Sequence, residues 1–225
     1  MSVLVVAAHP DDEVLGCGAT VARLVAEGEE VAILILGEGG TARLDRREDA
    51  APGLVDELAG LARSAGAVLG CSSVMFGGLP DNRFDSLDLL DIVHLVERHI
   101  GDVEPSTVMT HHPRDLNIDH QCTAAAVITA TRPLPGSRVR EVLAFEVLSA
   151  TEWSFDRSQP FRPNVFVNIA EHLDTKLAAL AVYDQEMRAF PHPRSTEAVR
   201  SLAALRGSTA GLRSAEAFEL LRQVR

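Results

Sequence analysis

The first 36 residues constrain the fold more than any other part of the chain. Residues 3–8 form a continuous apolar run of strand length, rich in Val, which is typical of a strand buried on both faces of a parallel sheet. Apolar residues at helical spacing follow over residues 13–27, and residues 31–36 are a second run of the buried-strand type. A strand, a helix and a strand in so short a segment predict a βαβ unit with a right-handed crossover.

Further apolar segments continue this alternation as far as about residue 150. Residues 196–206 and 215–222 are both predicted to be helical. We expect an α/β, Rossmann-like three-layer fold with a mostly parallel sheet. It forms one domain over residues 1–225, with an α/β core at 1–150 and a C-terminal strand/helix extension at 151–225. The other predicted strands cover residues 71–76, 106–110, 139–148 and 164–169, and the other predicted helices cover 55–65, 87–99, 119–131 and 173–187.

Composition excludes several classes of function. The formal net charge is −11, whereas a protein that binds nucleic acid through its phosphates needs a basic surface. Lys176 is the only lysine, so the chain lacks the Gly-Lys-Ser/Thr of a Walker A phosphate loop. No apolar run approaches the ~20 residues of a membrane-spanning helix. Three cysteines without metal or disulfide spacing favour a reducing compartment, so we expect a cytoplasmic protein that binds neither nucleic acid nor membrane.

A histidine and three acidic residues follow the first predicted strand directly: His9, Asp11, Asp12 and Glu13. In open parallel sheets, ligands bind at the carboxyl ends of the strands, where such a turn can direct several side chains into one crevice. His9 and Asp12 could bind one cation together, and an imidazole with a carboxylate suits zinc better than calcium or magnesium. The alternative is that these acids only cap the following helix.

A second group of the same kind follows the strand predicted at residues 106–110. Because the two strand ends belong to one sheet, the groups can meet in space and together supply a third ligand. Two histidines and one carboxylate, with the fourth position left to water, form a common ligand set for catalytic zinc. Helix capping explains two such groups less well than one. The candidates in the second group are His111, His112, Asp115, Asp119 and His120.

The motif at residues 8–13 (AHPDDE), together with residues 117–120 (NIDH), resembles the LmbE-like (PIG-L) family of N-acetylglucosaminyl deacetylases. The resemblance covers the first 150 residues well, and residues 190–195 (FPHPRS) resemble a bacterial subgroup of that family. It implies a single LmbE-like deacetylase domain: a metal-dependent hydrolase that removes an N-acetyl group from an amino sugar or an amino-sugar conjugate. The expected cofactor is one Zn²⁺ per chain, for which other divalent metals can substitute.

Position by position, the resemblance implies roles for five residues. His9, Asp12 and His120 are the expected metal ligands, which decides among the alternatives left open above. Asp11 is the expected general base, acting on the water that attacks the amide. Asp119 is expected to contact a ligand rather than the metal.

The resemblance does not assign the proton donor to the leaving amine, because many relatives carry His where this chain has Asn117. Asn can donate a hydrogen bond to substrate but cannot carry a proton. The acid is then Asp11 itself or another histidine. His192, with Arg194 beside it, is our first candidate, followed by His111 and His112. Arg47 and Asp81 are the other expected substrate contacts, although the first could be a solvated arginine and the second part of an ordinary turn.

The sequence also offers features of three other functions. Gly16 and Gly18 loosely resemble a dinucleotide-binding fingerprint, but the third glycine is absent. A non-catalytic metal or ligand-binding module would keep the ligands and would need no base. An amidase acting on another N-acyl natural-product intermediate would keep the whole site. The expected partner is a small N-acetylated sugar or sugar conjugate, and the family resemblance also implies a homo-oligomer.

Overall fold

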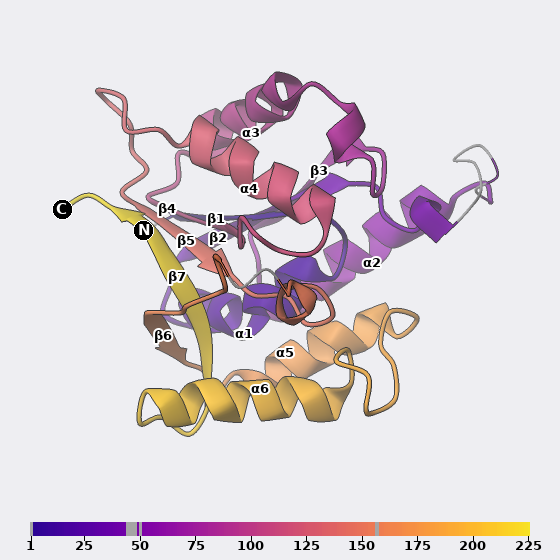
Figure 1. Ribbon diagram of the computed structural model, residues 1–225, viewed down its shortest axis with the longest axis vertical. Coiled ribbons are helices and arrows are strands. Elements are labelled where there is room, and N and C mark those ends of the chain that lie inside the picture. Colours follow the sequence, from indigo (N-terminus) through magenta and orange to yellow (C-terminus); the bar gives the residue numbers. More distant parts are fainter. Residues whose placement is uncertain (1, 44–48, 50, 156–157) are drawn as a thin grey trace.

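The computed structural model describes the chain except for residues 1, 44–48, 50 and 156–157 (Figure 1). Within the described residues, seven strands form one sheet in the order β3-β2-β1-β4-β5-β7-β6. The strands are β1 (Ser2–Ala7), β2 (Glu30–Gly37), β3 (Ser73–Leu79), β4 (Thr107–His111), β5 (Glu141–Phe145), β6 (Val165–Asn168) and β7 (Ala215–Gln223). The α-helices are α1 (Asp12–Ala26), α2 (Leu54–Leu69), α3 (Leu89–Val103), α4 (Ile118–Ala130), α5 (Leu173–Leu180) and α6 (Thr196–Thr209).

Helices cover both faces of the sheet, which confirms the predicted three-layer α/β fold. Figure 1 shows α3 and α4 on one face and α1, α2 and α5 on the other, with α6 beside α5. Strand β1 contributes to both cores, because successive side chains of a strand point to opposite faces. Val3 and Val5 pack with α1 and α2, whereas Leu4 and Val6 pack with α3 and α4.

The sheet is mostly parallel, as predicted. β1 pairs in parallel with β2 on one side and with β4 on the other, and β3 and β5 extend this parallel part outward. The carboxyl ends of β1 and β4 therefore lie side by side, although the strands are about 105 residues apart in the chain. This arrangement brings the two His/Asp groups to the same edge of the sheet.

The prediction that residues 215–222 form a helix was wrong. They form β7, which lies antiparallel between β5 and β6, with Phe218 opposite Phe145 and Ala217 opposite Phe166. Ala, Glu and Leu favour helices when isolated, but this segment completes a sheet whose neighbours bury Phe218 fully, and such packing overrides propensity. The helix predicted over residues 173–187 is also shorter, because α5 ends at Leu180 and a 3₁₀ turn follows.

Helix α1 is interrupted at Cys17, where φ is −144° and ψ is 17°. A buried ion pair satisfies backbone groups on both sides of this break. Lys176 Nζ donates to the carbonyl oxygen of Leu15 at 2.7 Å, and the Glu216 carboxylate accepts from two successive N–H groups, that of Thr20 at 2.6 Å. The two charged groups lie 2.6 Å apart. The only lysine of the chain thus joins α1, α5 and β7.

No helix in the described part of the chain is long and apolar enough to cross a lipid bilayer.

Candidate active site

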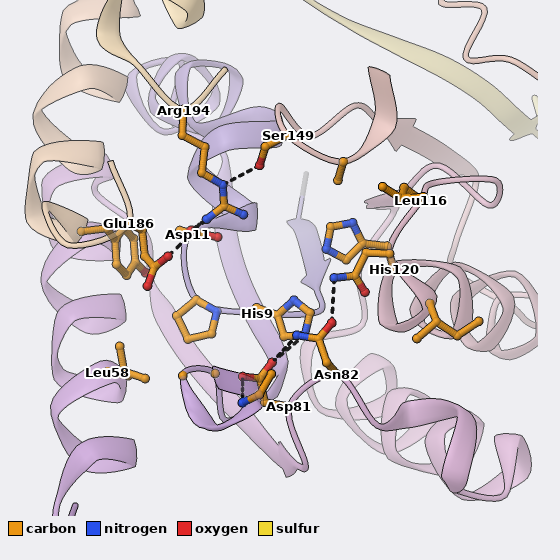
Figure 2. A pocket seen from close by; sticks show the side chains of 18 of the residues that line it. His9, Asp11, Leu58, Asp81, Asn82, Leu116, His120, Ser149, Glu186 and Arg194 are labelled. Carbon is orange, nitrogen blue, oxygen red and sulfur yellow. Dashed lines mark hydrogen bonds and ion pairs between the residues drawn. The ribbon is translucent and has the colours of Figure 1, made fainter. Parts of the chain in front are cut away.

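A cavity of about 530 Å³ opens at the carboxyl ends of the parallel strands (Figure 2). The turn after β1 and the segment between β4 and α4 form its floor, and loops after β2, β3 and β5 contribute to its walls. The C-terminal segment supplies the remaining side. Its lining residues are His9, Pro10, Asp11, Gly39, Gly40, Ala42, Leu58, Asp81, Asn82, Leu116, Asn117, Ile118, His120, Ser149, Ala150, Trp153, Tyr183, Glu186 and Arg194.

The carboxylate of Asp12 is fully buried and lies between the imidazoles of His9 and His120, two residues that line the cavity. Its Oδ2 accepts a hydrogen bond from the backbone N–H of His9 at 2.9 Å and lies 3.3 Å from His9 Nδ1 and 3.1 Å from His120 Nε2. Its Oδ1 is buried and has no hydrogen-bond partner among the described residues. Donor atoms of His9, Asp12 and His120 lie within 4.8 Å of one another. The structure therefore brings together the three residues predicted to be metal ligands.

Each of the two imidazoles also faces a second carboxylate, through the ring nitrogen that does not face Asp12. His9 Nε2 lies 3.0 Å from Asp119 Oδ2, and His120 Nδ1 lies 3.2 Å from Asp115 Oδ1. Asp119 is itself held by the backbone N–H of Phe84 at 2.9 Å. Such partners fix the orientation of a ligating histidine ring and increase its basicity. The position of Asp119 agrees with its predicted contact to a ligand, whereas the role of Asp115 was not predicted.

The acidic surroundings strongly favour positive charge at the floor. Burial alone would lower the pKa of His9, but hydrogen bonds to Asp119 and Asp12 outweigh it and raise the pKa to about 10. The pKa of His120 likewise rises to about 9, because the charges of Asp12 and Asp115 outweigh the effect of burial. Histidines with such pKa values carry protons when no other cation is present. A divalent cation would supply the same charge.

His9 also belongs to a second group that could hold a metal, with Asp81 and Asp119. Asp81 Oδ1 lies 3.3 Å from His9 Nε2, the same ring nitrogen that faces Asp119. Asp81 Oδ2 accepts from the backbone N–H of Ala42 at 2.9 Å. This second group therefore offers one imidazole nitrogen and two carboxylates that already have other partners.

The two other histidines that the sequence left open lie outside the cavity lining. His111 is fully buried under His120, with ring centroids 3.9 Å apart, and its Nε2 accepts from the backbone N–H of Ala8 at 2.8 Å. Burial lowers the pKa of His111 to about 3, so the ring is neutral. His112 lies away from this group, with its Nε2 3.3 Å from the carboxylate of Glu219.

Asp11 occupies a strained position at the start of α1. Its φ is 101° and its ψ −31°, a region that residues other than Gly seldom adopt and that costs about 1–3 kcal/mol. The backbone carbonyl, not the side chain, accepts the first helical hydrogen bonds, from Val14 and Leu15. The carboxylate instead borders the cavity and accepts from Arg194 Nη1 at 2.5 Å. Helix capping therefore does not explain the side chain of Asp11.

Glu13 and Tyr183 stabilise the turn at Asp11 through hydrogen bonds. Glu13 Oε2 accepts from the backbone N–H of Asp11 at 3.0 Å, and the Tyr183 hydroxyl donates to Glu13 Oε1 at 2.7 Å. Burial raises the pKa of Glu13 to about 8. Tyr183, which lies 170 residues from Glu13 in the chain, was not predicted to be part of the site.

The C-terminal segment reaches the cavity with Arg194 and not with His192. Arg194 Nε donates to Ser149 Oγ at 2.7 Å, while its Nη1 contacts both Asp11 and, at 3.4 Å, Glu186 (Figure 2). His192 does not border the cavity. Its ring packs against Trp153 with centroids 6.0 Å apart. The role of His192 as the acid therefore stays a prediction.

The predicted substrate contacts lie on the opposite wall. Asn117 Oδ1 caps helix α4 by accepting from the backbone N–H of Asp119 at 2.8 Å, and its Nδ2 donates to Asn82 Oδ1 at 3.0 Å. Asn82 in turn donates to Asp81 at 2.9 Å. These three side chains form one hydrogen-bonded row at the cavity, in which Figure 2 labels Asp81 and Asn82. Arg47 lies outside the described residues.

Comparison with known sequences gives relatives of one kind. The model of the family described as PIG-L, GlcNAc-PI de-N-acetylase, matches residues 4–131. The chain is 32% identical over 187 residues to an uncharacterized deacetylase, YaiS, of Escherichia coli K12, covering 79% of this chain and 88% of YaiS. It is 27% identical over 194 residues to a probable N-acetyl-alpha-D-glucosaminyl L-malate deacetylase of Bacillus cereus, covering 83% and 84% of the two chains.

Solved structures share the fold along the whole chain. The N,N'-diacetylchitobiose deacetylase of Pyrococcus horikoshii superposes with a TM-score of 0.77 at 19% identity, covering 98% of this chain and 84% of that one. GalB, the 4-carboxy-2-hydroxymuconate hydratase of Pseudomonas putida KT2440, superposes with a TM-score of 0.76 at 23% identity, covering 100% and 97%. A fold shared by a deacetylase and a hydratase does not by itself identify the reaction.

Proposed function

We propose that this chain, which belongs to the PIG-L family of de-N-acetylases, removes the N-acetyl group from an amino sugar or an amino-sugar conjugate with the help of a bound zinc ion. The observation that carries the proposal is the arrangement around Asp12. Two imidazoles that line the cavity converge on this buried carboxylate, and the carboxylate of Asp11 borders the same cavity.

The residues of the floor fit a divalent metal held by His9, Asp12 and His120. A buried carboxylate oxygen is normally hydrogen-bonded, and a cation would supply the partner that Asp12 Oδ1 lacks among the described residues. Carboxylates behind both imidazoles are the usual surroundings of ligating histidines. Two nitrogen donors and one oxygen donor suit zinc with an open position, although other first-row metals can occupy such a site.

A bound zinc ion would polarise the amide carbonyl and lower the pKa of water. We assign the role of general base, which takes the proton of the attacking water, to Asp11. Its carboxylate borders the cavity, and the residue lies between His9 and Asp12 in the chain. Arg194 holds that carboxylate through a charge-assisted hydrogen bond. As the C–N bond breaks, Asp11 can return the proton to the leaving nitrogen, which gives acetate and a free amine.

The cavity wall formed by Asp81, Asn82 and Asn117 is suited to sugar hydroxyls, because it offers both donors and acceptors. Arg47 is retained as a further contact on the basis of the sequence. The cytoplasmic location and the homo-oligomeric state also remain predictions of the sequence.

The direct test measures acetate and free amine from a panel of N-acetyl compounds. The panel contains N-acetylglucosamine, N,N'-diacetylchitobiose, a nucleotide-linked N-acetylglucosamine and N-acetylethanolamine, which has no sugar ring. We expect the protein to release acetate from the sugar compounds. Removal of the metal by a chelator should abolish this activity, and added zinc should restore it. His120→Ala should not recover, whereas His112→Ala, a histidine outside the cavity, should behave as the wild type.

Other outcomes point to other functions. Preferential hydrolysis of the compound without a sugar ring would favour the amidase. Metal and sugar binding without turnover would favour the binding module. Full release of acetate in the presence of a chelator would contradict the proposed requirement for a bound metal ion.

A further inference from the structure

Trp153 is the only tryptophan of the chain, and it borders the cavity. It lies in a short 3₁₀ turn after β5, Thr151–Trp153, and 38% of its surface is exposed. The large ring carries an apolar face that is stabilised when a ligand covers it. Ligand pockets commonly combine such aromatic faces with a few well-placed polar groups.

The ring of Trp153 packs against the C-terminal segment. The His192 and Trp153 rings meet nearly at right angles, with an interplanar angle of 81°. His192 stands between Pro191 and Pro193, and each proline restricts the backbone around it. The His192 ring is also fixed at Nδ1, which accepts from the backbone N–H of Arg194 at 3.0 Å.

The loop that carries Trp153 is bonded to the floor of the site. Thr151 Oγ1 donates to Asp115 Oδ2 at 2.6 Å, and Asp115 is the carboxylate behind His120. On its other side, Ser149 Oγ accepts from Arg194, which holds Asp11. The position of the indole is therefore fixed relative to both the predicted metal ligands and the predicted base.

We propose that Trp153 is the platform on which the sugar ring of the substrate stacks, and that His192 is a positioning residue that holds the indole in place. This inference rests on the proposed function, since the acetyl group of the stacked sugar must reach the floor of the cavity. A pyranose ring has apolar C–H faces and a polar edge. The indole offers an apolar surface, and the row of Asp81, Asn82 and Asn117 offers partners for the hydroxyls.

The same geometry gives His192 a task that requires no proton transfer. Its contact with Trp153 is an aromatic contact, which a phenyl ring can reproduce. An acid role and a supporting role for His192 therefore make opposite predictions for His192→Phe.

Because Trp153 is the sole tryptophan, fluorescence excited at a wavelength that tyrosine does not absorb reports on this ring alone. Titration with N-acetylglucosamine and N,N'-diacetylchitobiose should shift or quench the emission in a saturable way. N-acetylethanolamine, which carries the acetyl group but no sugar ring, should leave the emission unchanged. Glucosamine, the expected product, should also change the emission, and it allows binding to be read without turnover.

Kinetic variants test the same contact. Trp153→Ala should raise KM for the N-acetyl sugar by about tenfold and leave kcat within about twofold, as expected when a binding contact is removed. Trp153→Phe should fall between Trp153→Ala and the wild type. Phe155→Ala is the matched control, because Phe155 lies two residues away, is 85% exposed and does not border the cavity. It should show wild-type kinetics.

His192 is tested by three variants. His192→Ala should raise KM by about threefold and shift the emission of the free protein, because the indole loses its support. His192→Phe should restore both KM and emission, with unchanged metal content. His192→Asn controls for the hydrogen bond from the backbone N–H of Arg194, which the Oδ1 of Asn can accept and Phe cannot. A large fall in kcat in both His192→Phe and His192→Asn would overturn the supporting role and assign His192 a proton.

The outcomes separate the platform from the proposed reaction. Emission that stays constant at sugar concentrations above KM, or a wild-type KM in Trp153→Ala, would overturn the platform while the deacetylase stands. A saturable change in emission without any release of acetate would support the platform while the proposed reaction fails. Absence of both signals would overturn both.

Discussion

Replacement of Asp11 by Asn separates the proposed base from every structural role of this residue. Asn is nearly isosteric, and like Asp it tolerates a positive φ better than most residues, so the turn at φ 101° should persist. The Oδ1 of Asn can still accept from Arg194 Nη1. The backbone carbonyl, which starts helix α1, is unchanged. What is lost is the ability to accept a proton.

The expected effects on rate and on stability differ widely. Loss of general-base catalysis should lower kcat by about 10²–10⁴-fold, which corresponds to about 3–5 kcal/mol in the activation free energy. The free energy of unfolding should change by about 1 kcal/mol or less, because the backbone and the hydrogen bond to Arg194 are kept. Asp11→Ala should lose as much activity, but it should also destabilise the protein, since Ala at this φ is strained.

The assay combines three measurements on each variant: acetate release with an N-acetyl sugar, metal content by mass spectrometry, and unfolding in urea. For Asp11→Asn we expect full metal content, a near-normal unfolding midpoint and little turnover. Turnover within about tenfold of the wild type at full metal content would refute the reasoning, because it lies outside the range for loss of a general base.

Four further predictions concern other residues and the assembly of the chain. His120→Ala should bind less than one metal per chain, and full occupancy would contradict its role as a ligand. Arg194→Lys should lower kcat by about tenfold at unchanged metal content, because an ammonium group cannot reproduce the planar fork that contacts Asp11 and Ser149, and wild-type kcat would reject this positioning role. Lys176→Met should lower the free energy of unfolding in urea by about 3 kcal/mol or more, since it leaves a carboxylate buried without its ion-pair partner, and a loss below about 1 kcal/mol would contradict a contribution from this pair. Light scattering at micromolar concentration should give a homo-oligomer, and a monomer mass would reject that prediction.

The central parallel strands β1, β2 and β4 could be predicted because they are buried on both faces. Runs such as residues 31–36 have an apolar pattern that is typical of a central strand, and β2 (Glu30–Gly37) follows that run closely. Strand β3 was placed at residues 71–76, whereas it covers Ser73–Leu79. It continues through Gly77, where a Cβ would lie 2.7 Å from the carbonyl oxygen of Leu36. Close approach of two backbones leaves no periodic pattern in the sequence.

Strand β7 was missed for a different reason. Its sequence, AEAFELLRQ, is rich in residues that favour helices, and it becomes a strand through pairing with segments about 50 and 75 residues earlier in the chain. Contacts of that kind depend on the complete fold. Local propensity can therefore identify the elements of the parallel part of the sheet and still misassign β7, the strand that pairs antiparallel with both of its neighbours.

The candidate site divides in the same way. The two groups that form its floor could be predicted because they follow strand ends that a parallel sheet brings together. The choice of Asp12 and His120 within these groups came from the family resemblance. Tyr183 and Trp153 carry no such positional signal, since isolated aromatic residues in loops are common.

These unpredicted residues change how the segment after residue 150 relates to the reaction. The turn that presents Asp11 is strained, and a strained backbone persists only where its surroundings hold it. Glu13 holds the turn through the backbone N–H of Asp11, and Tyr183 holds Glu13. Arg194, 183 residues from Asp11 in the chain, fixes the carboxylate itself. Because Asp12 follows Asp11 directly, the same contacts also position a predicted metal ligand, so both the base and the metal site depend on packing of the C-terminal segment against the core.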